Sequence, residues 1–285
     1  MISQAQFQKE IELIITNAVR EDVGEGDHSS LACIPKEAKG RAKLLVKDDG
    51  IIAGVEFAKQ VFKYIDPELR VETLINDGEK VQKRDIVFFV EGSSHSILKA
   101  ERLVLNAMQR MSAIASKTKE FVKKLEGTNT KILDTRKTTP GIRALEKWAV
   151  KIGGGENHRF ALYDMVMLKD NHIDFAGGIT QAINKTKQYL KENGLDLKII
   201  VEARNLREIE EILESEGVYR ILIDNFDFAE TRKAVQLIGD RCLTESSGGI
   251  TLESVRKYAE CGVDYVSSGA LTHSIYNMDL SLKAV

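Results

Sequence analysis

The sequence predicts an α/β fold whose C-terminal part is a small barrel of parallel strands with helices between them. The chain has 285 residues, which at roughly 150 residues per domain suggests two domains or one large barrel with an addition. After residue 129, short apolar segments alternate with helical patterns. The strand ends at Glu202, Asp224, Glu245 and Ser267 are separated by 22, 21 and 22 residues. This spacing fits one strand, one helix and two short loops per unit.

The N-terminal part mixes helices and strands. Residues 3–22 predict an amphipathic helix that begins with a capping box of Ser3 and Gln6. Residues 41–92 are rich in short β-branched or alternating segments bounded by Gly or Asp. A long helix is predicted over about 99–125, because apolar residues recur there at helical spacing. The strands of the strand-rich region are expected at 41–47, 71–74 and 85–90.

The C-terminal part supplies the repeated units of the barrel. Its strands are expected at 131–136, 165–169, 198–202, 220–224, 242–245 and 264–267. Its helices are expected at 180–192, 206–215, 228–238 and 252–261. Six or seven such units favour closure into a barrel over an open Rossmann-like sheet, although periodicity alone is compatible with both.

Charged residues stand where these apolar strands end. Arg136 and Lys137 follow one strand, Lys169 ends another, and Glu202 and Asp224 end the next two. In a (β/α) barrel the carboxyl ends of the strands meet at one mouth, where active sites lie. For any single strand the charge could simply mark the point where the chain leaves the core. Several strands with the same pattern favour a shared charged mouth.

Small-residue loops follow the last two strands, at 246–249 (Ser-Ser-Gly-Gly) and 267–270 (Ser-Ser-Gly-Ala). Backbone N–H groups in such loops, together with the start of a following helix, can bind an anion. Loops in this place commonly hold a phosphate in barrels. A single glycine-rich loop is more often only a structural turn, so the prediction of a phosphate site depends on the presence of two such loops.

The segment 153–159 (Gly-Gly-Gly-Glu-Asn-His-Arg) completes neither a dinucleotide-binding nor a P-loop motif. Within it, His158 is either a structural histidine or, beside Arg159, part of an anion site. The carboxylates Glu202 and Asp224 could hold Mg²⁺ bridged to a pyrophosphate. These groups together suggest a substrate with several negative charges.

Composition excludes several other classes. Lys and Arg total 41 and Asp and Glu total 43, a net charge of −2, so no general affinity for nucleic acid or an anionic membrane surface is expected. No apolar run reaches the ~18 residues of a spanning helix, and the N-terminus shows no signal-peptide core. Three widely spaced cysteines argue against a disulfide framework and favour a reducing, cytoplasmic location.

Motifs spread over nearly the whole chain resemble those of the quinolinate phosphoribosyltransferase family, also called nicotinate-nucleotide pyrophosphorylase (carboxylating). The most specific are Asp134-Thr-Arg-Lys-Thr-Thr-Pro-Gly141, Glu156-Asn-His-Arg159 and Lys169-Asp-Asn-His172. Further matches are at 21–27, 101–106, 201–202, 224–226, 246–249 and 268–273.

The resemblance implies an α/β sandwich domain over 1–112 and an incomplete, TIM-like (β/α) barrel over 113–285, with the last residues packing back on the sandwich. It implies a homodimer, or a higher oligomer, in which the sandwich of one subunit covers the barrel mouth of the other and Arg102 serves the partner's site. The implied enzyme is a pentosyltransferase of NAD biosynthesis. It joins quinolinate to phosphoribosyl pyrophosphate with Mg²⁺ and yields nicotinate mononucleotide, pyrophosphate and CO₂.

The resemblance also implies roles for individual residues. Lys137, Lys169, Glu202 and Asp224 would be catalytic, and Glu202 and Asp224 would also hold the metal. Quinolinate would be bound by Arg102, Thr135, Arg136, Lys137, His158, Arg159 and Lys169. Phosphoribosyl pyrophosphate would be bound by Glu202, Asp224, Ser247, Gly248, Gly249, Ser268, Gly269 and Ala270. The physical properties agree, because arginine binds a carboxylate through two parallel hydrogen bonds.

Three alternatives compete with this interpretation. The chain could be a related pyridine phosphoribosyltransferase with another substrate, such as nicotinate. It could be a barrel lyase or aldolase in which Lys169 forms a Schiff base. It could also be a carrier module, since residues 76–85 resemble a turn of biotinyl and lipoyl domains. That segment lacks the Met-Lys pair that such domains modify.

Overall fold

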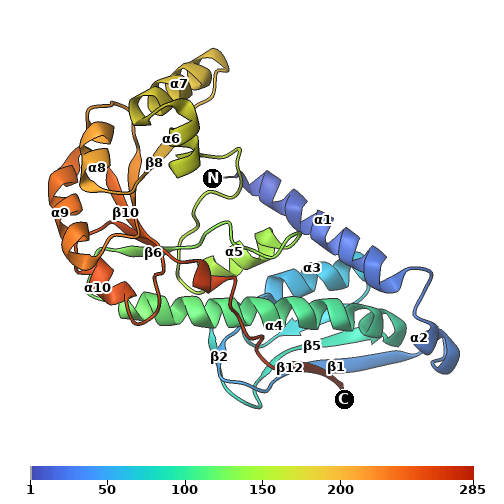
Figure 1. Ribbon diagram of the computed structural model, residues 1–285. Helices are drawn as coiled ribbons and strands as arrows, with labels where there is room; N and C mark the ends of the chain where they lie inside the picture. Colours follow the sequence, from blue (N-terminus) through green and yellow to red (C-terminus); the bar gives the residue numbers. More distant parts are fainter. Residues whose placement is uncertain (1) are drawn as a thin grey trace. The chain divides into compact units, whose positions relative to one another are not determined.

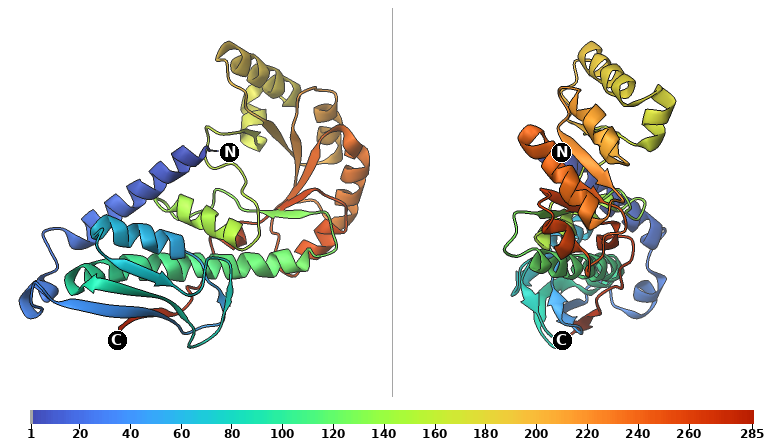
Figure 2. Two further views of the ribbon diagram at one scale, coloured as in Figure 1. Left: turned by 180° about the vertical axis from the view of Figure 1, so that it is seen from behind. Right: turned by 60° about the vertical axis from the view of Figure 1, so that its left-hand side comes forward.

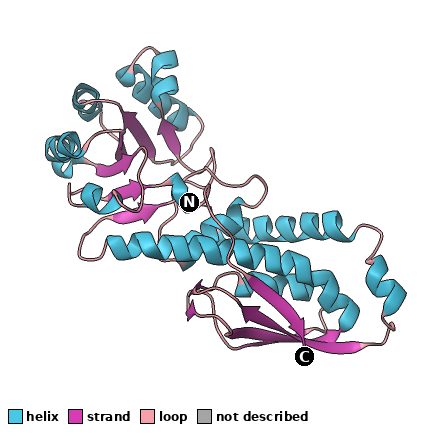
Figure 3. Cartoon of the chain, turned by 60° about the horizontal axis from the view of Figure 1, so that its bottom comes forward, coloured by secondary structure: helices cyan, strands magenta, loops and turns pink. Residues whose placement is uncertain are grey.

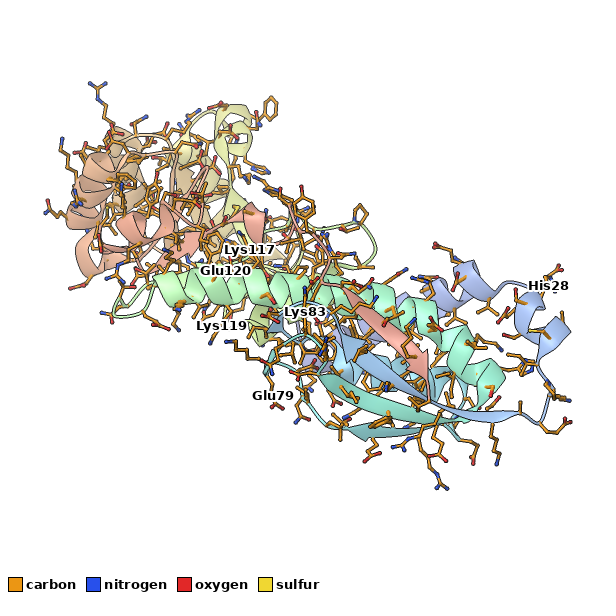
Figure 4. All side chains as sticks on the ribbon, turned by 90° about the horizontal axis from the view of Figure 1, so that it is seen from below. His28, Glu79, Lys83, Lys117, Lys119 and Glu120 are labelled. Atoms are coloured by element: carbon orange, nitrogen blue, oxygen red, sulfur yellow. The ribbon has the colours of Figure 1, made fainter. Side chains whose placement is uncertain are left out.

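The computed structural model describes residues 2–285, which fall into two compact units. The sandwich unit consists of Ser3–Lys119, Thr138–Gly154 and Leu271–Val285, and the barrel unit consists mainly of Glu120–Lys137 and Gly155–Ala270. Helix α4 (Ser94–Lys124) belongs to both units and passes from one to the other between Lys119 and Glu120, which are labelled in Figure 4. The expected boundary between residues 112 and 113 falls inside this helix and stays a prediction.

The sandwich unit contains a four-stranded antiparallel sheet of order β12-β1-β5-β3. Its strands are β1 (Lys39–Val46), β3 (Arg70–Thr73), β5 (Ile86–Ser93) and β12 (Leu280–Ala284). A separate pair is formed by β2 (Gly50–Ile51) and β4 (Lys80–Val81). The helices of this unit are α1 (Gln4–Val23), α2 (His28–Cys33), α3 (Val55–Ile65), most of α4, and α5 (Arg143–Ile152). Figures 1 and 3 show α3 and α4 over one face of the sheet.

Helix α3 lies within the region that the sequence predicted as strand-rich. Its buried residues Val55, Phe57, Ala58, Val61 and Phe62 follow a helical repeat and pack on the sheet, and Phe62 meets Phe88 of β5 edge to face at 5.8 Å. Burial of this apolar stripe outweighs the strand propensity of its Val and Phe residues.

The barrel unit contains six strands that are parallel throughout, in the order β6-β11-β10-β9-β8-β7. They are β6 (Lys131–Leu133), β7 (Val166–Leu168), β8 (Ile199–Ala203), β9 (Arg220–Asp224), β10 (Leu243–Ser247) and β11 (Tyr265–Ser267). Within residues 2–285, β6 and β7 are the two edges and do not pair with each other. A single bridge from Leu133 to Glu156 continues the sheet beyond β6.

Helices connect most of these strands and cover their outer side (Figures 1 and 2). They are α6 (Asp170–Ala176), α7 (Ile179–Glu192), α8 (Leu206–Leu213), α9 (Phe228–Ile238) and α10 (Val255–Ala259), with 3₁₀ turns η1 (Gly239–Arg241) and η2 (Gly269–Leu271). On the inner side, Met165, Met167, Ile200 and Leu222 form a small apolar core. The predicted combination of an N-terminal α/β sandwich and an incomplete (β/α) barrel is confirmed.

Among residues 2–285, no helix combines the length and the apolar character that crossing a membrane requires.

Candidate functional site

The strand register places Glu202 and Asp224 on the inner side of the barrel sheet. Glu202 of β8 lies opposite Leu222 of β9, and Leu222 belongs to the inner apolar core. Residues two apart on a strand point to the same face, so Asp224 points inward like Leu222. Both carboxylates stand near the carboxyl ends of adjacent strands, as the sequence predicted.

Lys169 comes directly after β7 and faces Glu202. Its Nζ lies 3.3 Å from Oε2 of Glu202, whose side chain is 8% exposed. The backbone N–H of Lys169 donates to Nδ1 of His172 at 3.0 Å, so this histidine caps the start of α6 and fixes the lysine backbone. The structure therefore brings together the charges that end β7 and β8.

Lys137 and Asp224 are coupled electrostatically to the pair of Lys169 and Glu202. Burial raises the pKa of Glu202, Lys169 opposes that rise, and Asp224 adds to it. Burial likewise raises the pKa of Asp224, while the Asn225 amide, Lys169 and Lys137 act in the opposite direction. We call Lys137, Lys169, Glu202 and Asp224 the carboxylate–lysine cluster.

Two inward carboxylates on neighbouring strands are a donor set that suits Mg²⁺. This ion usually binds through one or two protein carboxylates together with water and substrate phosphate oxygens. Within the described chain, no group of three or more His, Cys, Asp or Glu side chains is arranged to hold a metal by itself. The raised pKa values of Glu202 and Asp224 fit as well, because a bound cation would relieve the cost of two nearby buried negative charges.

Two guanidinium groups form the second part of the site. Arg159 is 6% exposed, and its pKa is lowered first by burial and then by the nearby charge of Arg136, with Asp164 acting against this. Its Nη1 donates to the carbonyl of Met165 at 3.3 Å. The charge of Arg136 therefore disfavours that of Arg159, and an anion bound between the two guanidinium groups would remove this repulsion.

Asp134 ties together the two motifs that carry these cations. It follows β6, is completely buried, and accepts the backbone N–H of His158 at 2.8 Å and the side-chain amide of Asn157 at 2.5 Å. On the other side, the Oγ1 atom of Thr135 accepts the backbone N–H of Lys137 at 3.0 Å. Thr135 therefore shapes the turn that presents Lys137.

The structure places the ring of His158 inside the barrel unit, with only 5% of the side chain exposed. Its Nδ1 accepts the backbone N–H of Arg159 at 2.6 Å. Its Nε2 lies 3.3 Å from Oε2 of Glu245. The sequence left open whether His158 is structural or binds an anion, and these contacts support the structural interpretation.

The two Ser/Gly loops are neighbours because they follow adjacent strands. The backbone N–H of Asn225 donates to the carbonyl of Ser247 at 2.9 Å, and that of Ser268 to the carbonyl of Leu133 at 3.1 Å. The Ser268 hydroxyl donates to the carbonyl of Ile250 at 2.7 Å. The remaining predicted phosphate-binding residues, Gly248, Gly249, Gly269 and Ala270, lie in these two loops.

The expected contribution of helix dipoles to these loops is not supported. The second loop runs directly into the 3₁₀ turn η2, and the first is followed by a turn before the five-residue helix α10. Any phosphate bound there would be held by loop N–H groups and hydroxyls.

Arg102 lies exposed on α4 in the sandwich unit. The other predicted site residues all lie in the barrel unit, so the contacts of this one chain do not test its predicted role.

Four further residues, which the sequence did not predict as part of the site, help to hold the predicted residues in place. Asp134, Asn225, Arg220 and Glu245 contact predicted site residues or their immediate partners. Asp134 and Asn225 stand within the quoted motifs, next to selected residues, and could have been found there. Glu245 stands at an expected strand end like Glu202 and could have been found by the same signal, whereas Arg220 begins its strand, where the sequence shows only a charge before an apolar run.

Replacing Gly248 by alanine is expected to lower the activity at least tenfold through Asp224. Asn225 donates from its side-chain amide to Oδ2 of Asp224 at 2.6 Å, and a Cβ on Gly248 would come within 2.2 Å of Oδ1 of Asn225. Gly248 also has φ +99°, which strains any other residue. Gly249→Ala is the control, because φ is +58° there but a Cβ would meet nothing within 4 Å. Equal losses in steady-state kinetics of the two variants would contradict this prediction.

Two family models match the chain and together span most of it. The model of the quinolinate phosphoribosyl transferase N-terminal domain matches residues 27–112. The model of the C-terminal domain of the same family matches residues 114–283.

Curated relatives and solved structures agree with these models. The chain is 46% identical to quinolinate phosphoribosyltransferase [decarboxylating] 1b of Nicotiana tabacum, over 95% of this chain and 81% of that protein. It is 38% identical to the probable nicotinate-nucleotide pyrophosphorylase [carboxylating] of Bacillus subtilis, over 96% and 93%. The crystal structure of NadC from Streptococcus pyogenes superposes with a TM-score of 0.89 at 35% identity, covering 100% of this chain and 99% of that one. The predicted resemblance is confirmed, and the chain belongs to the quinolinate phosphoribosyltransferase family.

Proposed function

We propose that this protein transfers the phosphoribosyl group of phosphoribosyl pyrophosphate to quinolinate and releases CO₂, pyrophosphate and nicotinate mononucleotide. The observation that carries the proposal is the carboxylate–lysine cluster after the carboxyl ends of the barrel strands, to which the pair of Arg136 and Arg159 adds further positive charge. Such a site suits two polyanionic substrates. Relatives that match nearly the whole chain carry the names of this activity.

Quinolinate is a dianion, and the cations of the site suit its two carboxylates. Arg136 and Arg159 offer planar donor pairs that match a carboxylate. Lys137 and Lys169 supply further positive charge near the reacting atoms. Thr135 and His158 contribute by holding Lys137 and Arg159 in place.

Phosphoribosyl pyrophosphate is proposed to lie between the two Ser/Gly loops and the carboxylates. The loops, with Ser247, Gly248, Gly249, Ser268, Gly269 and Ala270, would hold the 5-phosphate. Glu202 and Asp224 would hold Mg²⁺, which when bound neutralises charge on the departing pyrophosphate. The same carboxylates would face the ribose carbon that gains positive charge during transfer.

The reaction needs no covalent intermediate on the protein. The pyridine nitrogen attacks the ribose C1 atom while the bond from C1 to the pyrophosphate oxygen breaks. Loss of CO₂ then leaves an electron pair on the ring carbon next to the new pyridinium nitrogen. A proton binds to this carbon at the position that the carboxylate has left. Fixed cations close to this carbon stabilise the charge without reorganisation, and such preorganised electrostatics is a major source of rate enhancement.

Incubation of the protein with quinolinate, phosphoribosyl pyrophosphate and Mg²⁺ tests the proposal by the appearance of nicotinate mononucleotide. Replacing quinolinate by nicotinate distinguishes a related pyridine phosphoribosyltransferase. Absence of product with both pyridines would refute the assignment. Borohydride trapping of a substrate on Lys169 would instead support the aldolase alternative. The ion pair of Lys169 with Glu202 suits electrostatic binding better than Schiff-base formation.

We further propose that the enzyme is a homodimer in which Arg102 completes the partner's site, with assembly beyond the dimer left open. Its exposure on α4 of the sandwich unit is compatible with such a role. Arg102→Ala and Lys169→Met are each expected to be nearly inactive alone. After the two variants are mixed and exchange subunits, half of the dimers are hybrids, and each hybrid has one intact site out of two. The mixture is therefore expected to recover about one quarter of wild-type activity. Activity that stays at the level of the single variants after exchange, verified by native mass spectrometry, would show that Arg102 acts within its own subunit.

A cytoplasmic location remains part of the proposal, and fractionation of the source cells would test it. The printed names of some plant relatives place those proteins in mitochondria or chloroplasts.

A further inference from the structure

A buried ionic network lies on the inner side of the barrel sheet. Its centre is Glu245 of β10, which is completely buried. Oε2 of Glu245 accepts a hydrogen bond from Nη1 of Arg220 at 2.7 Å and lies 3.3 Å from Nε2 of His158. Arg220 in turn lies over the ring of Tyr265, 4.0 Å from its centroid. The proposed chemistry uses neither Glu245 nor Arg220.

Glu245 remains a carboxylate in these surroundings. Burial alone would raise the pKa of Glu245, but its contacts with His158, Arg220 and Ser267 lower it. At 3.3 Å the contact between His158 Nε2 and Glu245 is an electrostatic one and not a well-aligned hydrogen bond, and a buried carboxylate in this position favours the tautomer with the proton on Nε2.

The other ring nitrogen of His158 independently gives the same tautomer. Nδ1 accepts the backbone N–H of Arg159 at 2.6 Å, and a ring nitrogen that accepts a hydrogen bond carries no proton. The ring proton must therefore be on Nε2, the atom that faces Glu245. In this tautomer, His158 fixes the N–H of the residue that follows it.

That next residue is Arg159, whose guanidinium belongs to the proposed quinolinate site. The backbone N–H of His158 is held by Asp134 at 2.8 Å, and that of Arg159 by the His158 ring. If this ring rotated, the Arg159 N–H would lose its hydrogen-bond acceptor, and the backbone from which the Arg159 side chain extends would no longer be fixed. We propose that Glu245 is a positioning residue for the pyridine substrate: it holds His158 in the Nε2–H tautomer, and His158 in turn fixes Arg159.

This inference rests on the proposed function for its kinetic test but not for its spectroscopic one. Glu245→Gln preserves the shape of the side chain but removes its negative charge. We expect KM for quinolinate to rise about tenfold or more, as is typical when a partner that orients a binding group is lost. KM for phosphoribosyl pyrophosphate is expected to stay within about twofold. Arg220→Lys is the matched control, because it perturbs the same buried network but keeps the contact between Glu245 and His158. The KM of this variant for quinolinate is expected to stay near that of the wild type.

The tautomer is read directly from ¹⁵N spectra of the full chain labelled at histidine. The chain has five histidines, and the His158 signals are those lost in His158→Gln. The wild type is expected to show an unprotonated Nδ1 and a protonated Nε2. Glu245→Gln is expected to show a mixture of tautomers, because a ring that the carboxylate no longer holds can rotate away from the Arg159 N–H.

A wild-type ring protonated on Nδ1 would overturn the proposal. Equal rises of both KM values in Glu245→Gln, or an unchanged KM for quinolinate, would also overturn it. If Glu245→Gln does not fold, Glu245→Asp keeps the charge near Arg220 but draws it away from His158, and the same kinetic and spectroscopic changes are expected. If the wild type shows no turnover of quinolinate, the proposed function fails while the tautomer measurement still decides the positioning role.

Discussion

Lys169→Met is expected to lower kcat by about 10²–10³-fold, the usual effect of removing one preorganised charge from a transition state. Nζ of Lys169 stands 3.3 Å from the buried Glu202 carboxylate and influences the pKa of both Glu202 and Asp224. It is the lysine of the cluster that forms an ion pair with one of the two proposed metal-binding carboxylates. Because the Lys169 side chain is 49% exposed, its loss should change the free energy of unfolding little.

A matched control is available at the opposite ends of the same strands. Lys198 comes directly before β8, and its Nζ lies over the ring of Tyr219, 3.9 Å from the centroid. Lys198→Met makes the same chemical change in the same unit, and kcat is expected to stay within about twofold of the wild type. Steady-state kinetics with both substrates saturating compares the two variants. A loss of less than tenfold in Lys169→Met would show that this lysine is not part of the reaction.

Glu146→Ala is expected to cost about 3–5 kcal/mol of the free energy of unfolding, because it leaves a largely buried arginine without its counter-charge. Glu146 of α5 is completely buried. Its Oε1 accepts from Nε and Nη2 of Arg110 at 3.0 and 2.9 Å, and its Oε2 accepts the backbone N–H of Thr139 at 3.1 Å. Urea or guanidinium unfolding measures the loss.

The exposed pair of Glu72 and Arg41 in the same unit provides the control for this stability effect. Its side chains are 63% and 44% exposed at a separation of 2.8 Å. Glu72→Ala is expected to cost no more than about 1 kcal/mol. If Glu146→Ala costs as little as Glu72→Ala, the buried pair would not be an important source of stability in the sandwich unit.

The barrel unit could be predicted from the sequence nearly strand by strand. The predicted strand at 220–224 and helix at 228–238 have the observed bounds, and the other barrel strands differ by a few residues. The reason is local, because a buried parallel strand is a short apolar run that ends at a polar residue. The contact between Lys169 and Glu202 follows from the same logic, since both end neighbouring strands.

Features that depend on distant contacts could not be predicted in this way. Helices α3 and α5 are fixed by packing on other elements, and β12 was not expected as a strand because its partner β1 lies near the other end of the chain. The direction of the His158 ring was equally hidden. Its partner, Glu245, lies 87 residues further along the chain, and nothing in the motif around His158 indicates it.

The pairing of β12 with β1 has a consequence for how the protein is made. Ala42 pairs with Ala284, so the sheet of the sandwich unit acquires this strand only after residues 280–284 have left the ribosome. Until then one side of β1 has unsatisfied backbone groups and is open to pairing with other chains. The barrel sheet ends at Ser267 and can form earlier. We therefore expect the part of the protein that is synthesised first to complete its folding last.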